Sequence, residues 1–86
     1  MKQFTYTIKD ALGIHARPAG MLAKLAKEYG ETVITVSKGD KSVKASQLMK
    51  LMGLGIKQGN EIVVAAEGPA EEEAIAAMRK FFEENL

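Results

Sequence analysis

The stretch GIHARP at residues 13–18 separates two kinds of sequence pattern. Before it, residues 2–9 alternate between apolar and polar side chains, which is typical of a half-buried β-strand. After it, apolar residues recur every three or four positions, which is typical of an amphipathic helix. Pro18 fits the first turn of that helix, because the N–H that proline lacks would have no intrahelical partner there. The stretch therefore predicts a strand, a loop, and a helix N-terminus beside His15, the single histidine of the chain.

The start of this helix is also a candidate anion site. Its first N–H groups have no intrahelical acceptors, and the helix dipole is positive there. Arg17 adds a guanidinium whose forked donors suit phosphate or carboxylate. The dipole and Arg17 both disfavour an imidazolium and so favour the neutral, nucleophilic ring. A nucleophilic imidazole in such a cradle is what a transient phosphohistidine requires; the alternative is that His15 merely caps the helix.

Composition excludes several classes of protein. The 86 residues suit one small domain, 1–86, with a single core. A net charge of +1 gives no indication of nucleic acid as a partner. The absence of cysteine excludes a disulfide framework, and a single histidine argues against a protein-only zinc site. No segment predicts membrane insertion or a signal peptide. We therefore expect a cytoplasmic domain without metal or cofactor.

The remaining elements follow from periodicity and turn residues. A helix is predicted over residues 16–28, with strands at 32–36 and 42–45 forming a hairpin. A further strand is predicted at 61–66, followed by a final helix after Gly68. The expected buried residues of the two long helices are Leu22, Leu25, Ala26, Tyr29, Ile75, Met78 and Phe82. The acidic run at residues 71–73 is interpreted as solvated helix-start charge rather than as a metal or catalytic cluster.

A short helix is predicted after Ser46, which is a good N-cap candidate. Its four large apolar residues cannot all face inward, and we expect Leu48, Met49 and Met52 to be exposed. An exposed patch with methionines suits an adaptable docking surface. Periodicity alone leaves open the alternative that all four residues, Leu51 included, belong to the core.

The predicted order of elements is βαββαβα. We expect an α+β fold, an open-faced two-layer β-sandwich in which three helices cover one face of a four-stranded, mostly antiparallel sheet.

Two blocks of the sequence resemble one family. GIHARPA at residues 13–19 resembles the sequence around the active histidine of HPr, the phosphocarrier of the bacterial sugar phosphotransferase system. LMKLMGLGI at residues 48–56 resembles the second helix of that family and the loop after it. The order of elements and the length agree over essentially the whole chain, and the second block makes the resemblance specific.

The resemblance implies a function and the residues that carry it. His15 Nδ1 would accept a phosphoryl group from phosphorylated enzyme I and pass it to IIA components of sugar permeases. Arg17 and the backbone N–H groups of Ala16 and Arg17 would hold the phosphate. No general base or Mg²⁺ site is evident in the sequence, so we expect a carrier rather than an enzyme, with partners stabilising the transition state.

The resemblance also implies a docking surface around the histidine and the second helix, on a protein that we expect to be a monomer. We call this surface the docking patch. It comprises Gly20, Lys24, Lys27, Leu48, Met49 and Met52.

Regulation of the chain is a separate expectation. Many relatives carry a serine at the start of the second helix, which a dedicated HPr kinase/phosphorylase modifies. An ungapped alignment places that serine on Gln47, and we predict that the neighbouring Ser46 serves instead. A regulatory relative that binds a transcriptional regulator is an alternative. An RNA-binding module is disfavoured by the five aromatic residues and the low net charge.

Overall fold

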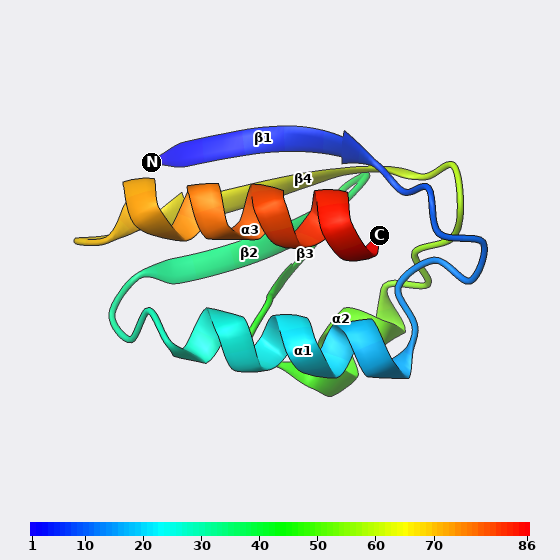
Figure 1. The fold of residues 1–86 in the computed structure, drawn as a ribbon, viewed down its shortest axis with the longest axis horizontal. Coiled ribbons are helices and arrows are strands. Elements are labelled where there is room, and N and C mark those ends of the chain that lie inside the picture. Colours follow the sequence, from blue (N-terminus) through cyan, green and yellow to red (C-terminus); the bar gives the residue numbers. More distant parts are fainter.

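The computed structural model describes residues 1–86 and confirms the predicted βαββαβα order (Figure 1). The elements are β1 (Lys2–Thr7), α1 (Ala16–Lys27), β2 (Val33–Lys38), β3 (Lys41–Lys44), α2 (Leu48–Gly53), β4 (Glu61–Glu67) and α3 (Glu71–Asn85).

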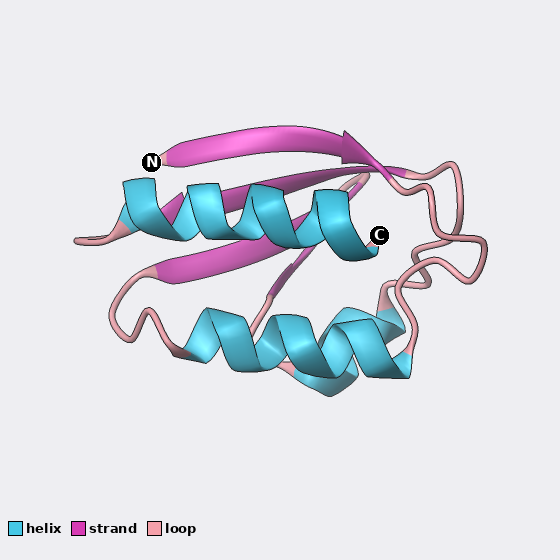
Figure 2. Cartoon of the chain, in the orientation of Figure 1, coloured by secondary structure: helices cyan, strands magenta, loops and turns pink.

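The four strands form one sheet in the order β1-β4-β2-β3, and every neighbouring pair is antiparallel. β4 lies between the first two strands in sequence, with Val64 opposite both Phe4 and Val36. The three helices lie on one side of the sheet and leave its other side open (Figure 2). The predicted open-faced sandwich is therefore confirmed, and the sheet is wholly antiparallel.

Alternation along the strands builds the core as predicted. Phe4 of β1, followed by Ile8, faces the helices, as do Ile62 and Val64 of β4, and all four side chains are buried. From α3, Phe82 is fully buried, and its ring meets that of Phe4 edge-on with the ring centres 6.0 Å apart. This contact fixes α3 over β1.

The buried side of α1 differs slightly from the prediction. Leu22 and Ala26 are buried, but Leu25 and Tyr29 are only half-buried. Ala19 and Ala23 are buried as well. With Leu22 and Ala26 they form one stripe along the helix, at positions i, i+3, i+4 and i+7 counted from Ala19. Three of the four residues in this stripe are therefore alanine. In α3, Met78 and Phe82 are buried as predicted, and Ile75 is half-buried.

Several predicted boundaries differ from the structure by one or two residues; β2 and β3, for example, were predicted at 32–36 and 42–45. Ser46 is not the N-cap of the second helix: α2 begins at Leu48, and Gln47 is its N-cap without a side-chain capping bond. The Gln47 N–H donates to the Lys44 carbonyl, so the chain still turns at Ser46. Thr32 lies before β2, and its hydroxyl accepts a hydrogen bond of 2.9 Å from the Ala70 N–H.

None of the three helices has both the length and the apolar character needed to cross a bilayer.

Candidate functional site

The loop that carries His15 runs from the end of β1 to the start of α1 and is closely packed. Gly13 has a φ of +67°, and a Cβ there would collide with the Ile56 carbonyl oxygen. The Ile14 N–H donates to that same oxygen at 3.2 Å. Glycine is therefore required at residue 13, because only a residue without a side chain lets the two loops approach.

The end of α3 anchors the other side of this loop. The N–H groups of Lys9 and Asp10 both donate to the carbonyl oxygen of Leu86, at 2.6 and 2.8 Å. Leu86 is buried, and Figure 1 shows the end of α3 at the same end of the molecule as the loop. Sequence reasoning missed this contact because residues distant in the chain give no periodic signal.

His15 is the N-cap residue of α1. Its backbone is extended, with φ −110° and ψ 180°, and its carbonyl accepts the Ala19 N–H at 2.9 Å. Its imidazole makes no capping hydrogen bond. His15 is therefore the N-cap residue, as the alternative interpretation expects, but its ring is not occupied in a capping hydrogen bond.

The first turn of α1 presents unsatisfied donors, as the sequence predicted. The N–H groups of Ala16 and Arg17 make no hydrogen bond within the chain, and Pro18 has no N–H. The turn contains no acidic residue. The Arg17 side chain is exposed beside it. Together these groups form an open end of a helix that suits an oxyanion.

A shallow pocket of about 220 Å³ gathers this chemistry at the surface. Its lining residues are Asp10, His15, Arg17, Pro18, Met21 and Asn85. The His15 side chain is 37% exposed, which leaves it accessible to a partner protein.

Asp10, Met21 and Asn85 are the residues of this pocket that sequence reasoning did not single out, and Asp10 is the charged one. Its Oδ1 lies 3.9 Å from His15 Nε2 and accepts a hydrogen bond of 2.8 Å from the Leu12 N–H. The carboxylate places a negative charge beside the ring, opposite in sign to the helix N-terminus and Arg17, and the sequence expectation did not take this charge into account. The only sequence signal was an acidic residue in the same short loop.

The second helix exposes the side chains that were predicted to be exposed. Leu51 is fully buried, whereas Met49 is 79% exposed and Leu48 and Met52 are both at the edge of exposure. α2 packs beside α1. On α1, Lys24 and Lys27 are exposed, and Gly20 has open space where a side chain would be. The residues of the docking patch are therefore accessible on two adjacent helices.

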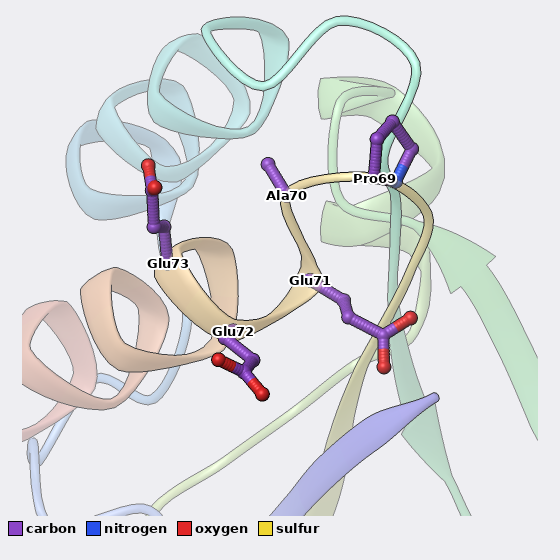
Figure 3. A pocket seen from close by; sticks show the side chains of 5 residues that line it. All are labelled: Pro69, Ala70, Glu71, Glu72 and Glu73. Atoms are coloured by element: carbon purple, nitrogen blue, oxygen red, sulfur yellow. The ribbon is translucent and has the colours of Figure 1, made fainter.

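The acidic run at the start of α3 lies in a separate pocket, with three side chains that point in different directions (Figure 3). Glu71 pairs with the Met1 amino group at 3.0 Å and accepts a bond from the Gly68 N–H. These two contacts, the amino group first, lower the pKa of Glu71 below its usual value. No group of three or more acidic or histidine side chains comes together in a way that could hold a metal ion.

Comparison with known proteins identifies the family. A family model described as "PTS HPr component phosphorylation site" matches residues 2–84. The phosphocarrier protein HPr of Mycoplasma genitalium is 39% identical over 85 residues, which are 99% of this chain and 97% of that protein.

Solved structures share the fold. A histidine-containing phosphocarrier protein from Mycoplasma superposes with a TM-score of 0.92 at 34% identity, covering 96% of this chain and 93% of the other. An HPr dimer from Thermoanaerobacter tengcongensis gives 0.76 at 42% identity, covering 98% and 95%. On these matches, the chain belongs to the HPr family of phosphocarrier proteins of the phosphotransferase system.

Proposed function

We propose that His15 carries the phosphoryl group of this phosphocarrier, on Nδ1. The observation that supports this most strongly is the open start of α1, where two N–H groups without acceptors lie beside an imidazole that does not cap the helix. Arg17 lines the same pocket. Residues 15–17 therefore supply both a nucleophile and the donors that would bind the phosphoryl group.

The transfer is a displacement at phosphorus. The Nδ1 lone pair forms the N–P bond, while the bond from phosphorus to the donor atom breaks and its electron pair stays with the donor. Arg17 and the N–H groups of Ala16 and Arg17 stabilise the phosphoryl oxygens. A helix N-terminus contributes about 0.3–1 kcal/mol at an exposed site. Such modest stabilisation suits a carrier, because a tightly held phosphate would not be released.

The donor in this proposal is phosphorylated enzyme I, and the acceptors are IIA components of sugar permeases. The docking patch supports this role because it combines exposed apolar side chains on α2 with Lys24 and Lys27 on α1. An apolar centre with a basic rim suits partners that carry acidic groups, and it favours fast, weak association. Successive partners can therefore use one face.

The chain acts in this proposal as a cytoplasmic, monomeric carrier without its own turnover. Its partners supply the remaining transition-state stabilisation. Light scattering tests the oligomeric state, with 9.3 kDa expected for a monomer. A mass twice as large would contradict the monomer and match the state of the solved thermophilic dimer.

Ser46 is proposed as a regulatory phosphorylation site for an HPr kinase/phosphorylase, with a transcriptional regulator as a reader of the modified form. Ser46 is half-buried and lines a surface hollow together with Lys27 and Lys44. A phosphate there would be close to both ammonium groups and would add negative charge next to the docking patch. Phosphosite mapping after kinase treatment tests this, and an unmodified Ser46 would contradict it.

The carrier function is tested by mixing the protein with phosphoenolpyruvate, Mg²⁺ and a sugar-system enzyme I, and following intact mass. We expect one acid-labile phosphoryl group on the native chain and none on His15→Ala. A labelled His15→Ala variant would contradict the assignment. A native chain that stays unlabelled, with an enzyme I that charges another HPr, would contradict the sugar-system role.

A further inference from the structure

Asp10 lies beside the histidine but outside the cradle that holds the phosphate. Its carboxylate is 3.9 Å from Nε2 of His15, the ring nitrogen that the proposed reaction does not use. The Asp10 and His15 side chains are 31% and 37% exposed, so both are partly shielded from solvent. This is the only carboxylate that pairs with His15.

The carboxylate is held in place before any partner binds. The Asp10 N–H donates to the Leu86 carbonyl, and the Asp10 carbonyl accepts the Gly13 N–H at 2.9 Å. Oδ1 accepts the Leu12 N–H at 2.8 Å, which fixes the side chain as well. A negative charge positioned in this way needs no reorganisation when charge develops on the ring.

A neutral imidazole carries one N–H, and the group that faces each nitrogen decides which one has it. An ionised carboxylate only accepts hydrogen bonds, so it favours the proton on the nitrogen that it faces. Asp10 faces Nε2. The proton is therefore favoured on Nε2, and the lone pair of Nδ1 is left free on the other side of the ring.

We propose that Asp10 is a positioning residue that holds His15 in the Nε2–H tautomer and stabilises the charge of the phosphorylated ring. This inference rests on the proposed role of His15 as the phosphoryl acceptor. When Nδ1 forms its bond to phosphorus and the donor bond breaks, the Nε2 proton stays in place and the ring becomes cationic. Asp10 remains ionised and pairs with that cation; onward transfer of the phosphoryl group returns the ring to neutrality.

The length of the contact defines how Asp10 acts. At 3.9 Å the two groups are beyond direct hydrogen-bond distance, so the interaction in the free protein is electrostatic. Contacts of this kind are often long in a free protein and shorten in the reacting complex. Arg17 lines the same pocket and supplies the opposing positive charge.

Asp10 also has a structural role, because its Oδ1 accepts the Leu12 N–H. One substitution separates this role from the effect of its charge. Asparagine at residue 10 keeps an Oδ1 that can accept the Leu12 N–H, because asparagine closes the same type of turn. It removes the negative charge that selects the tautomer. Asp10→Asn therefore tests the charge with the turn intact, whereas Asp10→Ala removes both.

The test is a ¹⁵N NMR measurement of the imidazole in the unphosphorylated protein, at a pH where the ring is neutral. We expect the Nε2–H form to dominate in the native chain, both tautomers to be populated in Asp10→Asn, and Asp10→Glu to recover part of the native distribution. Phosphorylation of Asp10→Asn by enzyme I should be slower by about tenfold, since part of the ring is in the tautomer that cannot attack and the cationic ring loses its counter-charge. Asp40→Asn, in the β2–β3 turn, is the matched control for net charge.

Failure of this inference is distinguishable from failure of the proposed function. An unchanged tautomer ratio in Asp10→Asn, with His15 still phosphorylated at the native rate, would overturn the role of Asp10 alone. A native chain that carries no phosphate on His15 would overturn both, and the mass measurement detects that outcome independently. Loss of tautomer control in Asp40→Asn would also contradict the inference, because it would assign the effect to net charge.

Discussion

The starts of α1 and α3 are both helix N-termini, but the chain satisfies them differently. At α3, Glu71 accepts the Gly68 N–H, and Thr32 accepts the Ala70 N–H. At α1, the N–H groups of Ala16 and Arg17 have no acceptor, and no acidic residue occurs in the first turn. Of these two helix starts, the one without acidic side chains in its first turn is the one beside the histidine. The proposed anion site thus lies at the helix start whose own first turn carries no carboxylate.

The largest effect should come from making the start of α1 resemble that of α3. Ala16→Glu places a carboxylate where the phosphoryl oxygens would bind, and phosphorylation by enzyme I should slow by about a hundredfold, or ~2.7 kcal/mol. Stability should stay equal or rise by about 0.3–1 kcal/mol, because an acidic residue suits a helix N-terminus. Rates and urea unfolding measure the two effects. Lys80→Gln on α3, which also lowers the net charge by one at an exposed position, is the control, and a fast Ala16→Glu carrier would contradict the comparison.

A glycine precedes each helix start and allows a close approach of two backbones. A Cβ at Gly13 would collide with the Ile56 carbonyl oxygen, and a Cβ at Gly68 would lie 2.7 Å from Thr32 Cα. Both residues have positive φ, so each alanine variant should lose about 2 kcal/mol of unfolding free energy. Under conditions where both variants are folded, only Gly13→Ala should transfer phosphate slowly. Equal transfer rates would show that the loop before His15 tolerates displacement.

Arg17 adds a cation to the start of α1, and the start of α3 has no such residue in its first turn. Arg17→Gln should slow phosphoryl transfer by about tenfold, or ~1.4 kcal/mol, the size of one hydrogen bond to a charged group. The transfer rate of Arg17→Lys should lie between those of the native chain and Arg17→Gln, since lysine keeps the charge but loses the forked geometry. Arg79→Gln on α3 makes the same change in net charge. If Arg79→Gln slows transfer equally, the effect of Arg17 is one of overall charge.

The smallest expected effect is the pH dependence of stability that Glu71 causes at the start of α3. The pKa of Glu71 is lowered in the folded chain, so its ionised form stabilises the fold above the ordinary glutamate range of about 4.3. That stability is lost as pH falls through the lowered folded-state value. The stabilities of the native chain and Glu71→Gln should therefore differ at pH 7, and the difference should shrink as pH falls below the ordinary glutamate range. A difference that does not depend on pH would contradict an electrostatic role.

Local patterns predicted most of the fold. The alternation of Phe4, Tyr6 and Ile8 located β1, and the spacing of Leu22 and Ala26 located the inner side of α1. The short apolar run at residues 48–52 correctly divided into one buried and three exposed positions. The strand and the helix depend on neighbours in sequence and so show in the periodicity, whereas periodicity alone left the exposure of Leu48, Met49 and Met52 open.

The missing parts of the site depend on contacts between distant residues. Leu86 holds Lys9 and Asp10 through its carbonyl oxygen, and no side-chain pattern encodes such a backbone contact. Asp10 looked like a strand-ending residue until the fold placed it beside His15. The N-cap of α2 was misplaced by one residue because a turn through Ser46 precedes the helix.

The open start of α1 is tested most directly by NMR on the phosphorylated protein. We predict ¹⁵N–³¹P coupling at His15 Nδ1, together with large amide shifts at Ala16 and Arg17 and unchanged amides at residues 71–73. Coupling at Nε2, phosphate on any other residue, or amide shifts that are equal at the two helix starts would contradict the account.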